Sequence, residues 1–454
     1  MILQDWWYTT LLGTDAPLQR PLKGDIRADV AIVGAGMAGL SAALRVMDSG
    51  RQVVLLERNV CGGSSTGRSA GFLTPDSELE LSQLVRRFGP EGARHVWQVP
   101  VQGIDLITGH VRAHAIECDL VRQDSLFVGN GRDGWKDVRQ ECEARQALGY
   151  PHTVYSPDQL PAVLGSSRYV GGVRYPGTYG INALRYAQGI KRVLLAHGVR
   201  ICESTEAHRI DGHTVRTHLG SVAADQIIVC VDKPKPFLTP YARNVFHAQT
   251  FLAISEPLDE RNVARLFPEE PLQCWDTDLV YSYWRLTGDR RLLVGGGSAL
   301  TTFALHAITT PRVIQSVVRR FKAKFPYLKD LVFIQYWPGL IDTTRDLFPT
   351  VLRDERAPWI HFVLGCVGLP WAAFCGDFVA RHALDPDGRR IITTIATSPP
   401  IARSCCRSAP SGCSANRCCS LSTMRGRNTT KWMAAGAFRP EGASPNARSR
   451  RQNA

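Results

Sequence analysis

Apolar residues along the chain fall into short runs whose spacing predicts alternating strands and helices. Residues 29–33 form an apolar, β-branched run, which is typical of a buried parallel strand. Residues 37–49 place small and apolar side chains on one side of a predicted helix, and Gly50 follows where a helix C-terminus favours glycine. Residues 52–57 predict a second buried strand. This order is that of a βαβ unit with a right-handed crossover.

The pattern downstream predicts further helices and an antiparallel sheet. Residues 61–72 are mostly small and predict a loop, whereas residues 77–120 have the amphipathic spacing of a helix. Residues 182–198 predict another helix with Asn182 as its N-terminal cap. The remaining predicted strands are 199–202, 213–218, 226–231, 250–254, 280–286, 291–295 and 360–364, and the remaining predicted helices are 311–325 and 369–383.

The turn between the first predicted strand and helix is a candidate nucleotide site. Residues 34–39 (Gly-Ala-Gly-Met-Ala-Gly) match G-x-G-x-x-G, and the second strand ends in an acid, Glu57, which would accept hydrogen bonds from ribose hydroxyls. The glycines permit a tight turn, close approach of the backbone to a pyrophosphate and close packing of helix on strand. A glycine-rich turn in an unrelated α/β fold is the competing interpretation. The residues assigned to the pyrophosphate are Gly34, Gly36, Met37, Ala38 and Gly39.

Three features favour FAD over NAD as the dinucleotide. The motif begins about thirty residues from the N-terminus. A long loop of small residues, 61–72, follows the second strand. A second glycine motif at 365–368 follows the last predicted strand, which predicts one cofactor held by both ends of the chain.

The charge of the chain is unevenly distributed. The 454 residues carry 54 Lys and Arg against 41 Asp and Glu, and this net charge of +13 alone would suggest an anionic partner. Residues 403–454 hold ten basic side chains and one acid, a net of +9, which leaves +4 for the preceding residues. We therefore expect neither a nucleic-acid nor a membrane partner.

Cysteines are concentrated in the same segment. Five of the 13 lie within residues 403–454, and the other eight are scattered singly, which predicts buried thiols in a reducing compartment, the cytoplasm. No secretion signal is visible at the N-terminus. The longest apolar run, residues 31–44, is too short to span a bilayer.

The composition of residues 403–454 predicts a disordered tail. The segment has no Ile or Val, one Leu and one Phe, so it cannot bury enough apolar surface to fold. A basic arm that contacts nucleic acid or membrane and a metal-binding cysteine tract are two interpretations. The abrupt change in composition favours a third, translation out of frame after about residue 385. Sequencing of the gene tests it, because the alternative frame must then encode a flavoenzyme-like end.

Four stretches of the chain carry a resemblance to a known family. Residues 29–73 resemble the N-terminal FAD-binding segment of the D-amino-acid-oxidase-type flavoenzymes, in particular the glycine oxidase and gamma-glutamylputrescine oxidoreductase branch. Residues 283–297 (YWRLTGDRRLLVGGG) are similar to the substrate-domain strand pair of that branch. Residues 337–351 (WPGLIDTTRDLFPTV) resemble its late flavin-contacting segment, and residues 360–384 resemble its C-terminal flavin-capping helix.

The resemblance implies an α/β fold with a discontinuous, Rossmann-like FAD-binding domain and an antiparallel-sheet α+β substrate domain. The FAD-binding domain is expected over residues 1–80, 160–240 and 335–390, and the substrate domain over residues 81–159 and 241–334. The implied cofactor contacts beyond the first glycine motif are Glu57, Arg58, Ser65, Thr66, Gly67, Ser69, Gly365, Val367, Gly368, Leu369 and Pro370.

The implied activity is FAD-dependent oxidation of the C–N bond of an amine or amino acid. Hydride passes from the carbon that bears the amine to flavin N5, water hydrolyses the imine, and O₂ is reduced to H₂O₂. A gamma-glutamylputrescine-like amine is one candidate substrate. The alternatives are a dehydrogenase that uses an acceptor other than O₂ and a non-catalytic or degenerate flavin-binding protein. The sequence leaves the oligomeric state open.

The resemblance also implies roles for the loop and the second glycine motif. Arg68 lies where family members approach the isoalloxazine ring, and a cation there would stabilise the charge of reduced flavin. An arginine that pins the loop to backbone carbonyls is the alternative. Residues 367–371 are expected to begin the capping helix with free N–H groups near flavin O2 and N1, and Pro370 suits this first turn.

The predicted strand 280–286 carries the candidate substrate residues. Tyr281, Tyr283 and Arg285 alternate, so they are expected on one face, where a hydroxyl and a guanidinium would hold a substrate carboxylate. The alternative is an exposed sheet face with Arg285 in solvent. Trp337 and Trp371 either line the substrate cavity or belong to the core.

Two further expectations concern the cofactor and metals. Residues 337–345, the region in which sarcosine-oxidase relatives carry a flavin-linked cysteine, contain no cysteine, and Cys366 lies farther along, so we expect non-covalent FAD. Asp346 is expected to cap backbone N–H groups of its own loop. The histidines lack metal-ligand spacing, so we expect no metal site.

Overall fold

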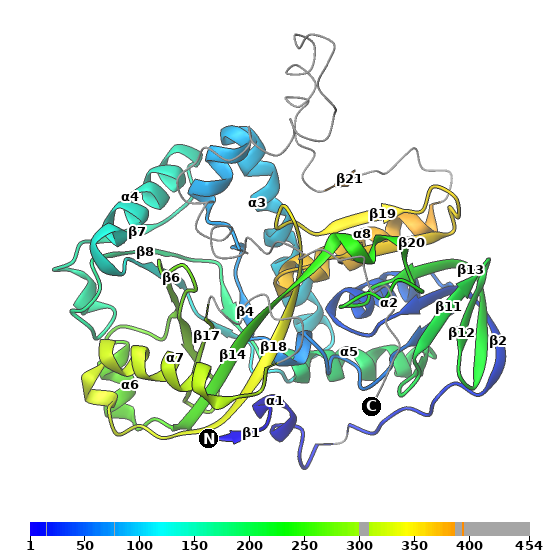
Figure 1. Cartoon of the computed structure of the whole chain (residues 1–454), viewed down its shortest axis with the longest axis horizontal. Coiled ribbons are helices and arrows are strands. Elements are labelled where there is room, and N and C mark those ends of the chain that lie inside the picture. Colours follow the sequence, from blue (N-terminus) through cyan, green and yellow to red (C-terminus); the bar gives the residue numbers. More distant parts are fainter. Residues whose placement is uncertain (15, 77, 299–307, 386–392, 395–454) are drawn as a thin grey trace, which may run out of the picture. The chain divides into compact units, whose positions relative to one another are not determined.

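The structure, a computed structural model, shows two large sheets with helices packed around them (Figure 1). The residues up to Ile401 form one contact unit. The predicted tail over 403–454 lies outside the described residues. The described residues are 1–14, 16–76, 78–298, 308–385 and 393–394.

The sheet that carries the first glycine motif has a parallel core. Its central strand β2 is almost entirely apolar in its second half, which is expected when both faces of a strand are covered. The parallel strands, in spatial order, are β10 (Arg200–Cys202), β3 (Val53–Leu56), β2 (Gly24–Val33), β13 (Gly220–Val229) and β20 (Ile360–Leu364). The antiparallel additions are β19 (Thr350–Arg353), β21 (Thr393–Thr394), β11 (Ala207–Asp211) and β12 (Thr214–Thr217).

The second sheet is mostly antiparallel and mixes early and late parts of the chain. Parallel pairs occur where β1 meets β18 and where β6 meets β15. Its strands, in spatial order, are β1 (Ile2–Leu3), β18 (Phe333–Thr344), β14 (Val245–Pro257), β17 (Arg291–Gly296), β16 (Tyr283–Leu286), β15 (Gln273–Asp276), β6 (Ser125–Val128), β8 (Gly172–Tyr175) and β7 (Thr153–Tyr155). A small third sheet contains β4 (Phe72–Leu73), β9 (Tyr179–Gly180) and β5 (Val121–Arg122).

The described helices cover these sheets. The α-helices are α1 (Trp6–Thr9), α2 (Met37–Asp48), α3 (Leu81–Ala113), α4 (Gly131–Leu148), α5 (Ala183–Ala196), α6 (Glu260–Leu266), α7 (Pro311–Lys324) and α8 (Leu369–Leu384). The short 3₁₀ helices are η1 (Thr66–Arg68), η2 (Leu160–Ala162), η3 (Pro240–Asn244) and η4 (Pro326–Leu328).

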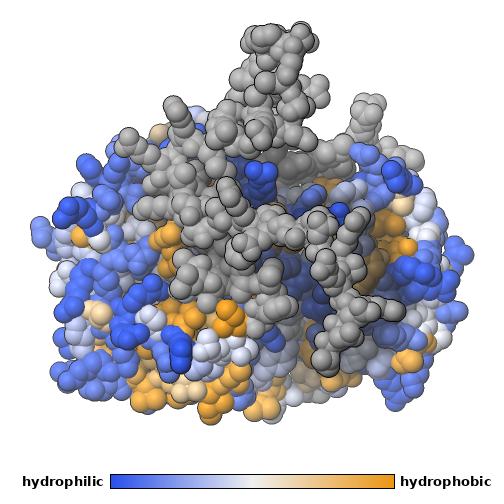
Figure 2. Space-filling model, in the orientation of Figure 1, coloured by the Kyte–Doolittle hydropathy of each residue, from blue (hydrophilic) through white to orange (hydrophobic). Residues whose placement is uncertain are grey.

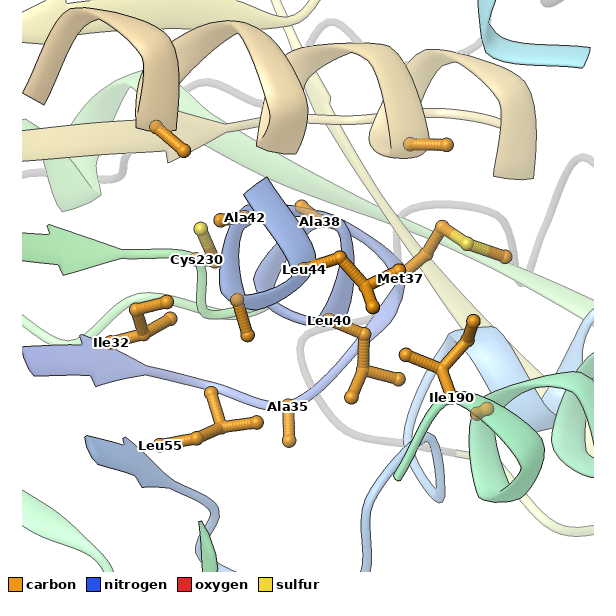
Figure 3. Close-up of a cluster of buried hydrophobic side chains, with 14 of the residues drawn as sticks. Ile32, Ala35, Met37, Ala38, Leu40, Ala42, Leu44, Leu55, Ile190 and Cys230 are labelled. Atoms are coloured by element: carbon orange, nitrogen blue, oxygen red, sulfur yellow. The ribbon is translucent and has the colours of Figure 1, made fainter. Parts of the chain in front are cut away.

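Helix α2 lies at the centre of the largest hydrophobic cluster. Figure 3 shows it between strands β2 and β3 on one side and helix α8 on the other. Leu40 and Leu55 are essentially inaccessible to solvent, as is Ala42. The approach of α8 is so close that a Cβ on Gly376 would lie 2.0 Å from the carbonyl oxygen of Ala38. The predicted βαβ unit and the predicted last helix are therefore one packed core.

Two predicted elements need correction. The helix predicted over 77–120 begins at Leu81 and ends at Ala113, and it is broken at Gly89, which has φ 71° and is followed by Pro90. A proline cannot continue the hydrogen-bond ladder of the preceding turn, so the helix is interrupted here although the amphipathic spacing is continuous. The strand predicted over 280–286 is shorter, β16 alone, and Tyr281 precedes it in the turn after β15.

The helix predicted over 182–198 is confirmed as α5. Its N-cap Asn182 accepts a hydrogen bond from the Arg185 backbone N–H at 3.1 Å. The predicted strand 360–364 coincides with β20.

The exposed surface mixes charge with isolated apolar side chains. In the face that Figure 2 shows, apolar residues gather along the lower edge, where Figure 1 places strand β1, and Ile2 and Leu3 of that strand are exposed. None of the described helices is both long and apolar enough to cross a bilayer.

Candidate active site

The first glycine motif forms the turn between β2 and α2 that the sequence predicted. Gly34 has φ 100°, and a Cβ on it would lie 2.6 Å from the carbonyl oxygen of Cys230. A Cβ on Gly39 would lie 1.8 Å from the carbonyl oxygen of Gly34. Both positions therefore require glycine, one for backbone conformation and one for contact between helix and turn. Gly36, the N-cap of α2, supplies no capping side chain to the helix terminus.

Glu57 and Thr66 fix this turn from two sides. The Ala35 backbone N–H donates to Glu57 Oε2 at 2.9 Å, and the Asn59 N–H donates to Oε1 at 2.9 Å. Burial raises the pKa of Glu57, while these two hydrogen bonds oppose that rise. The Met37 N–H donates to Thr66 Oγ1 at 3.0 Å. The loop predicted to contact the cofactor is thus attached to the helix N-terminus.

A second polar group sits where β13 ends. Asp232 Oδ2 accepts from Ser64 Oγ at 2.5 Å and lies 2.7 Å from Ser65 Oγ and 2.8 Å from Lys233 Nζ. Burial opposes ionisation, but Lys233 and the two hydroxyls hold the pKa of Asp232 well below its usual range. The Arg58 guanidinium lies 3.6 Å from Asp232 Oδ1. Predicted contacts Arg58 and Ser65 are therefore brought together by an aspartate that the sequence analysis did not single out.

Asp342 connects this group to β18. Its carboxylate accepts from the Lys233 backbone N–H and lies 2.9 Å from His247 Nδ1. Ser65 Oγ also lies 2.9 Å from the carbonyl oxygen of Leu340 in the same strand. The end of β13, the loop and the late strand are thereby held together.

Four consecutive carbonyl groups of the loop are each bound by a residue from elsewhere in the chain. The Trp337 indole N–H donates to the Arg68 carbonyl at 3.1 Å, and the Trp7 indole N–H donates to the Ser69 carbonyl at 2.8 Å. Arg285 Nε donates to the Ala70 carbonyl at 2.7 Å. The next carbonyl, that of Gly71, accepts from the Ile181 backbone N–H at 2.9 Å. The loop is therefore fixed along its length.

Arg285 is buried, so the alternative that it lies in solvent is wrong. Only 2% of the residue is exposed, and each of its three nitrogens donates to a backbone carbonyl, with Ile181 and Leu286 as the other two acceptors. A Cβ on Gly71 would lie 2.6 Å from the Arg285 guanidinium, and a Cβ on Gly180 would lie 2.8 Å from it. The pinning role considered for Arg68 is thus performed by Arg285, while the Arg68 side chain is exposed.

The second glycine motif begins helix α8 beside the first motif. Gly365 has φ 64°, and a Cβ on it would meet the Thr344 side chain at 2.7 Å. Gly368, with φ 88°, is the N-cap of α8, and no side chain caps it. Val367 and Leu369 are buried, as is Pro370, whose carbonyl lies against Gly103 of α3. Strand β13 lies between β2 and β20 and is parallel to both. The two glycine turns follow β2 and β20 directly, so they lie at the same edge of the sheet.

Tyr281 and Tyr283 lie next to each other, and neither takes part in the hydrogen bonds between Arg285 and the backbone carbonyls. Their ring centroids are 5.7 Å apart, and Tyr281 Oη donates to Glu78 Oε1 at 3.5 Å. Tyr283 packs edge to face on Phe72, at 5.9 Å, and both Tyr283 and Ala70 of the fixed loop pack against the hydrophobic cluster that contains Trp7 and Trp337. This places the two tyrosines next to the segment predicted to face the isoalloxazine ring.

Three carboxylates next to this region form a buried ionic cluster. Asp76, Glu80 and Glu141 approach one another closely, and Arg145 Nη2 lies 2.9 Å from Glu141 and 3.7 Å from Asp76. Burial raises the pKa of Asp76 to about 6, and Arg145 opposes the rise. Since a guanidinium already neutralises part of this charge, the cluster is best described as an ion-pair network.

Several of these residues carried no recognised signal in the sequence. Asp232 and Lys233 were detectable in principle, because they follow a buried parallel strand directly. Glu78 lies close to Tyr281 only through tertiary folding. Asp346 accepts from the Phe348 N–H at 3.4 Å, in agreement with its predicted capping role. Trp337 and Trp371 are both buried.

The described residues fit a flavin dinucleotide. Gly34 and Gly39 leave backbone where a Cβ could not be placed, the N-terminus of α2 has no side-chain cap on Gly36, and Glu57 ends the adjacent strand. The second glycine turn lies at the same sheet edge. It would extend the binding site from the adenosine diphosphate half of the dinucleotide toward its flavin half.

Comparison with known proteins agrees with this geometry. The sequence model of the FAD dependent oxidoreductase family (DAO) matches residues 29–382. The chain is 26% identical over 381 residues to the probable oxidoreductase OrdL of Haemophilus influenzae, covering 81% of this chain and 86% of that protein. It is 27% identical over 373 residues to the gamma-glutamylputrescine oxidoreductase of Escherichia coli, covering 80% and 84%.

The fold is also similar to that of solved structures. Glycine oxidase from Geobacillus kaustophilus superposes with a TM-score of 0.69 at 16% identity, covering 82% of this chain and 98% of that chain. L-proline dehydrogenase from P. horikoshii superposes with a TM-score of 0.64 at 16% identity, covering 80% and 93%. The predicted α/β class with its mixed sheets is thus confirmed. With its family model matched over most of its length, the chain belongs to the DAO family of FAD-dependent oxidoreductases.

Proposed function

We propose that this protein oxidises the C–N bond of an amine or amino acid. FAD supplies the chemistry when bound, by accepting hydride at N5 from the carbon that bears the amine. The resulting imine is hydrolysed by water, and the two electrons reduce O₂ to H₂O₂. The observation that carries the proposal is the pair of glycine turns at one sheet edge, next to a loop whose four carbonyls are individually fixed.

The residues of the chain would bind and orient the reactants. The turn at Gly34, with Glu57, would hold the adenosine diphosphate half of the cofactor, and the turn at Gly365 would approach the flavin half. Arg68 keeps an exposed side chain on the fixed loop and is the candidate to stabilise developing negative charge. Tyr281 and Tyr283, whose ring centroids are 5.7 Å apart, are the candidates to line the substrate side. We also propose the division predicted from the sequence, with an FAD-binding domain over residues 1–80, 160–240 and 335–390 and a substrate domain over residues 81–159 and 241–334.

We further propose that FAD is held without a covalent bond. Residues 337–345, the region in which sarcosine-oxidase relatives carry a flavin-linked cysteine, contain no cysteine, and Cys366 lies farther along, half-buried within the second glycine turn. Acid precipitation of the purified protein tests this. Yellow colour in the supernatant supports non-covalent binding, and colour retained in the pellet contradicts it.

Anaerobic bleaching of the bound flavin is the experiment that tests the activity. The panel contains gamma-glutamylputrescine, the substrate suggested by the relative's name, with glycine, sarcosine, D-amino acids and simple polyamines. Bleaching at 450 nm by any of these supports the proposal. A yellow protein that no amine reduces would be a non-catalytic flavin-binding protein.

A second measurement identifies the electron acceptor. Oxygen consumption that matches H₂O₂ release would establish an oxidase. Bleaching by an amine without oxygen consumption would instead indicate a dehydrogenase that transfers electrons to a quinone or a protein.

A further inference from the structure

A row of aromatic rings beside the fixed loop ends at one acidic side chain, Glu78. Phe72 lies 6.5 Å from Trp275 and 5.9 Å from Tyr283, and Tyr283 lies 5.7 Å from Tyr281. Tyr281 Oη is 3.5 Å from Glu78 Oε1. We call these five residues the aromatic–acid group. Except for the buried Trp275, each is only half-buried, so part of each side chain remains accessible.

The chemistry of this group suits a cation. Ring faces attract ammonium groups, and a carboxylate with few other partners adds a full opposite charge. Burial raises the pKa of Glu78 to about 7, against which only the hydroxyl of Tyr281 acts. A bound ammonium would supply the missing compensation.

Two buried arginines near this group, Arg285 and Arg145, are already engaged, whereas Arg68 on the fixed loop has an exposed side chain. The nitrogens of Arg285 donate to three backbone carbonyls, so its guanidinium is not free to clamp a substrate carboxylate. Arg145 is paired with Glu141 and Asp76 and lies over the Tyr175 ring at 3.4 Å. The aromatic–acid group itself contains no basic side chain.

We propose that the aromatic–acid group receives the ammonium of the amine substrate. The inference rests on the proposed oxidation and assigns the residues that bind the nitrogen of its substrate. Glu78 acts here as the residue that determines specificity, and Tyr281 orients its carboxylate.

Binding of inert probes to the flavin-loaded protein tests the proposal without turnover. Isothermal titration calorimetry compares butyltrimethylammonium with butanoate, which carries the opposite charge. Butyltrimethylammonium is a quaternary cation, so it has no neutral amine form and is not oxidised. The wild-type protein is expected to bind the cation at least about tenfold more tightly than butanoate. Tighter binding of butanoate would overturn the proposal with no variant required.

Variants identify the residue responsible. Glu78→Gln keeps the shape of the side chain and removes its charge, and we expect about a tenfold loss of cation affinity. Tyr281→Phe is expected to weaken binding less. Glu117→Gln removes an exposed glutamate and is the matched control. If Glu78→Gln binds the cation as tightly as the wild-type protein does, the role assigned to Glu78 is wrong. Should Glu78→Gln not fold, wild-type affinity in Tyr281→Phe would contradict the proposal in the same way.

The two proposals can fail separately. If amines bleach the flavin equally well in wild type and Glu78→Gln, the oxidase proposal stands and the specificity proposal fails. If the cation binds through Glu78 but no amine bleaches the flavin, the recognition proposal stands and the oxidation proposal fails.

Discussion

Arg285 Nε donates to the carbonyl oxygen of Ala70 at 2.7 Å, across a sequence separation of 215 residues. This contact joins β16 of the antiparallel sheet to the loop that follows the nucleotide-binding strands. The buried Arg285 therefore has a structural role, whereas the alternation of residues along the predicted strand suggested that it binds substrate. Several measurable consequences depend on it and on the neighbouring contacts.

Replacement of Arg285 by Lys should destabilise the protein and loosen its flavin. An ammonium cannot satisfy three carbonyls in the fork geometry, and each unsatisfied buried acceptor costs about 1–3 kcal/mol. We expect the free energy of unfolding in urea to fall by about 3 kcal/mol, with faster release of FAD.

The matched control is Arg27→Gln, because Arg27 pairs with Asp225 while both side chains are largely exposed. It should change stability by less than about 1 kcal/mol. An Arg285→Lys protein of normal stability with a raised KM for a carboxylate substrate would instead restore the substrate-binding role.

Replacement of Gly39 by Ala should abolish flavin incorporation. The added methyl group would lie 1.8 Å from the Gly34 carbonyl oxygen, so helix α2 would have to move away from the turn. The ratio of absorbance at 450 nm to that at 280 nm in purified protein measures the effect. Gly109→Ala, in α3 with nothing within 4 Å of the new Cβ, should retain full flavin and serves as the control.

Cation affinity should depend on pH through Glu78. Because the pKa of Glu78 is about 7, its carboxylate is protonated below that pH and ionised above it. Affinity for butyltrimethylammonium, which does not titrate, should therefore fall as the pH is lowered through 7. Calorimetry at pH 6 and pH 8 measures the difference.

The other ionisable groups around Glu78 define the control for this experiment. Tyr281 and Tyr283 have pKa values raised by burial, so their hydroxyls stay neutral over this range. Glu80, which accepts from the Trp275 indole, also has a pKa raised by burial. If Glu78→Gln retains the wild-type pH dependence, Glu80 or Asp76 is the titrating group.

Removal of Arg145 should be more costly than removal of an exposed arginine from the same helix. Arg145→Met leaves Asp76 and Glu141 buried without their partner, and we expect a loss of about 3–5 kcal/mol in unfolding free energy. Arg139 is exposed on α4, so Arg139→Met should be near neutral. Equal urea midpoints for the two variants would show that the cluster stabilises nothing.

The sequence analysis succeeded where local pattern and physics coincide. Residues 29–57 combine two apolar strands, an amphipathic helix and glycines at positions that only glycine fits, so strand, turn and helix were all predictable. Asn182 was identified as a cap for the same reason, since its side chain acts three residues away. The second glycine motif was recognisable because it follows an apolar strand.

It failed where partners are distant in the chain. Arg285 binds carbonyls near residues 70 and 181, and backbone acceptors leave no trace in residue identity. Glu78 and Tyr281 are 203 residues apart, so no spacing rule relates them. The helix predicted over 77–120 was too long at both ends, and its hydrophobic periodicity also continues through Gly89, where the backbone is kinked.

The packing of Gly376 against Ala38 has a consequence for synthesis of the protein on the ribosome. Strand β2 and helix α2 emerge early, but β13, β20 and α8, which cover them, are translated nearly 200 to 340 residues later. The nascent chain therefore exposes an apolar strand and helix until translation is almost finished, which is the kind of surface that chaperones bind. A ribosome stalled before α8 would hold a chain with the first glycine turn and both candidate tyrosines, but without the helix that packs on α2.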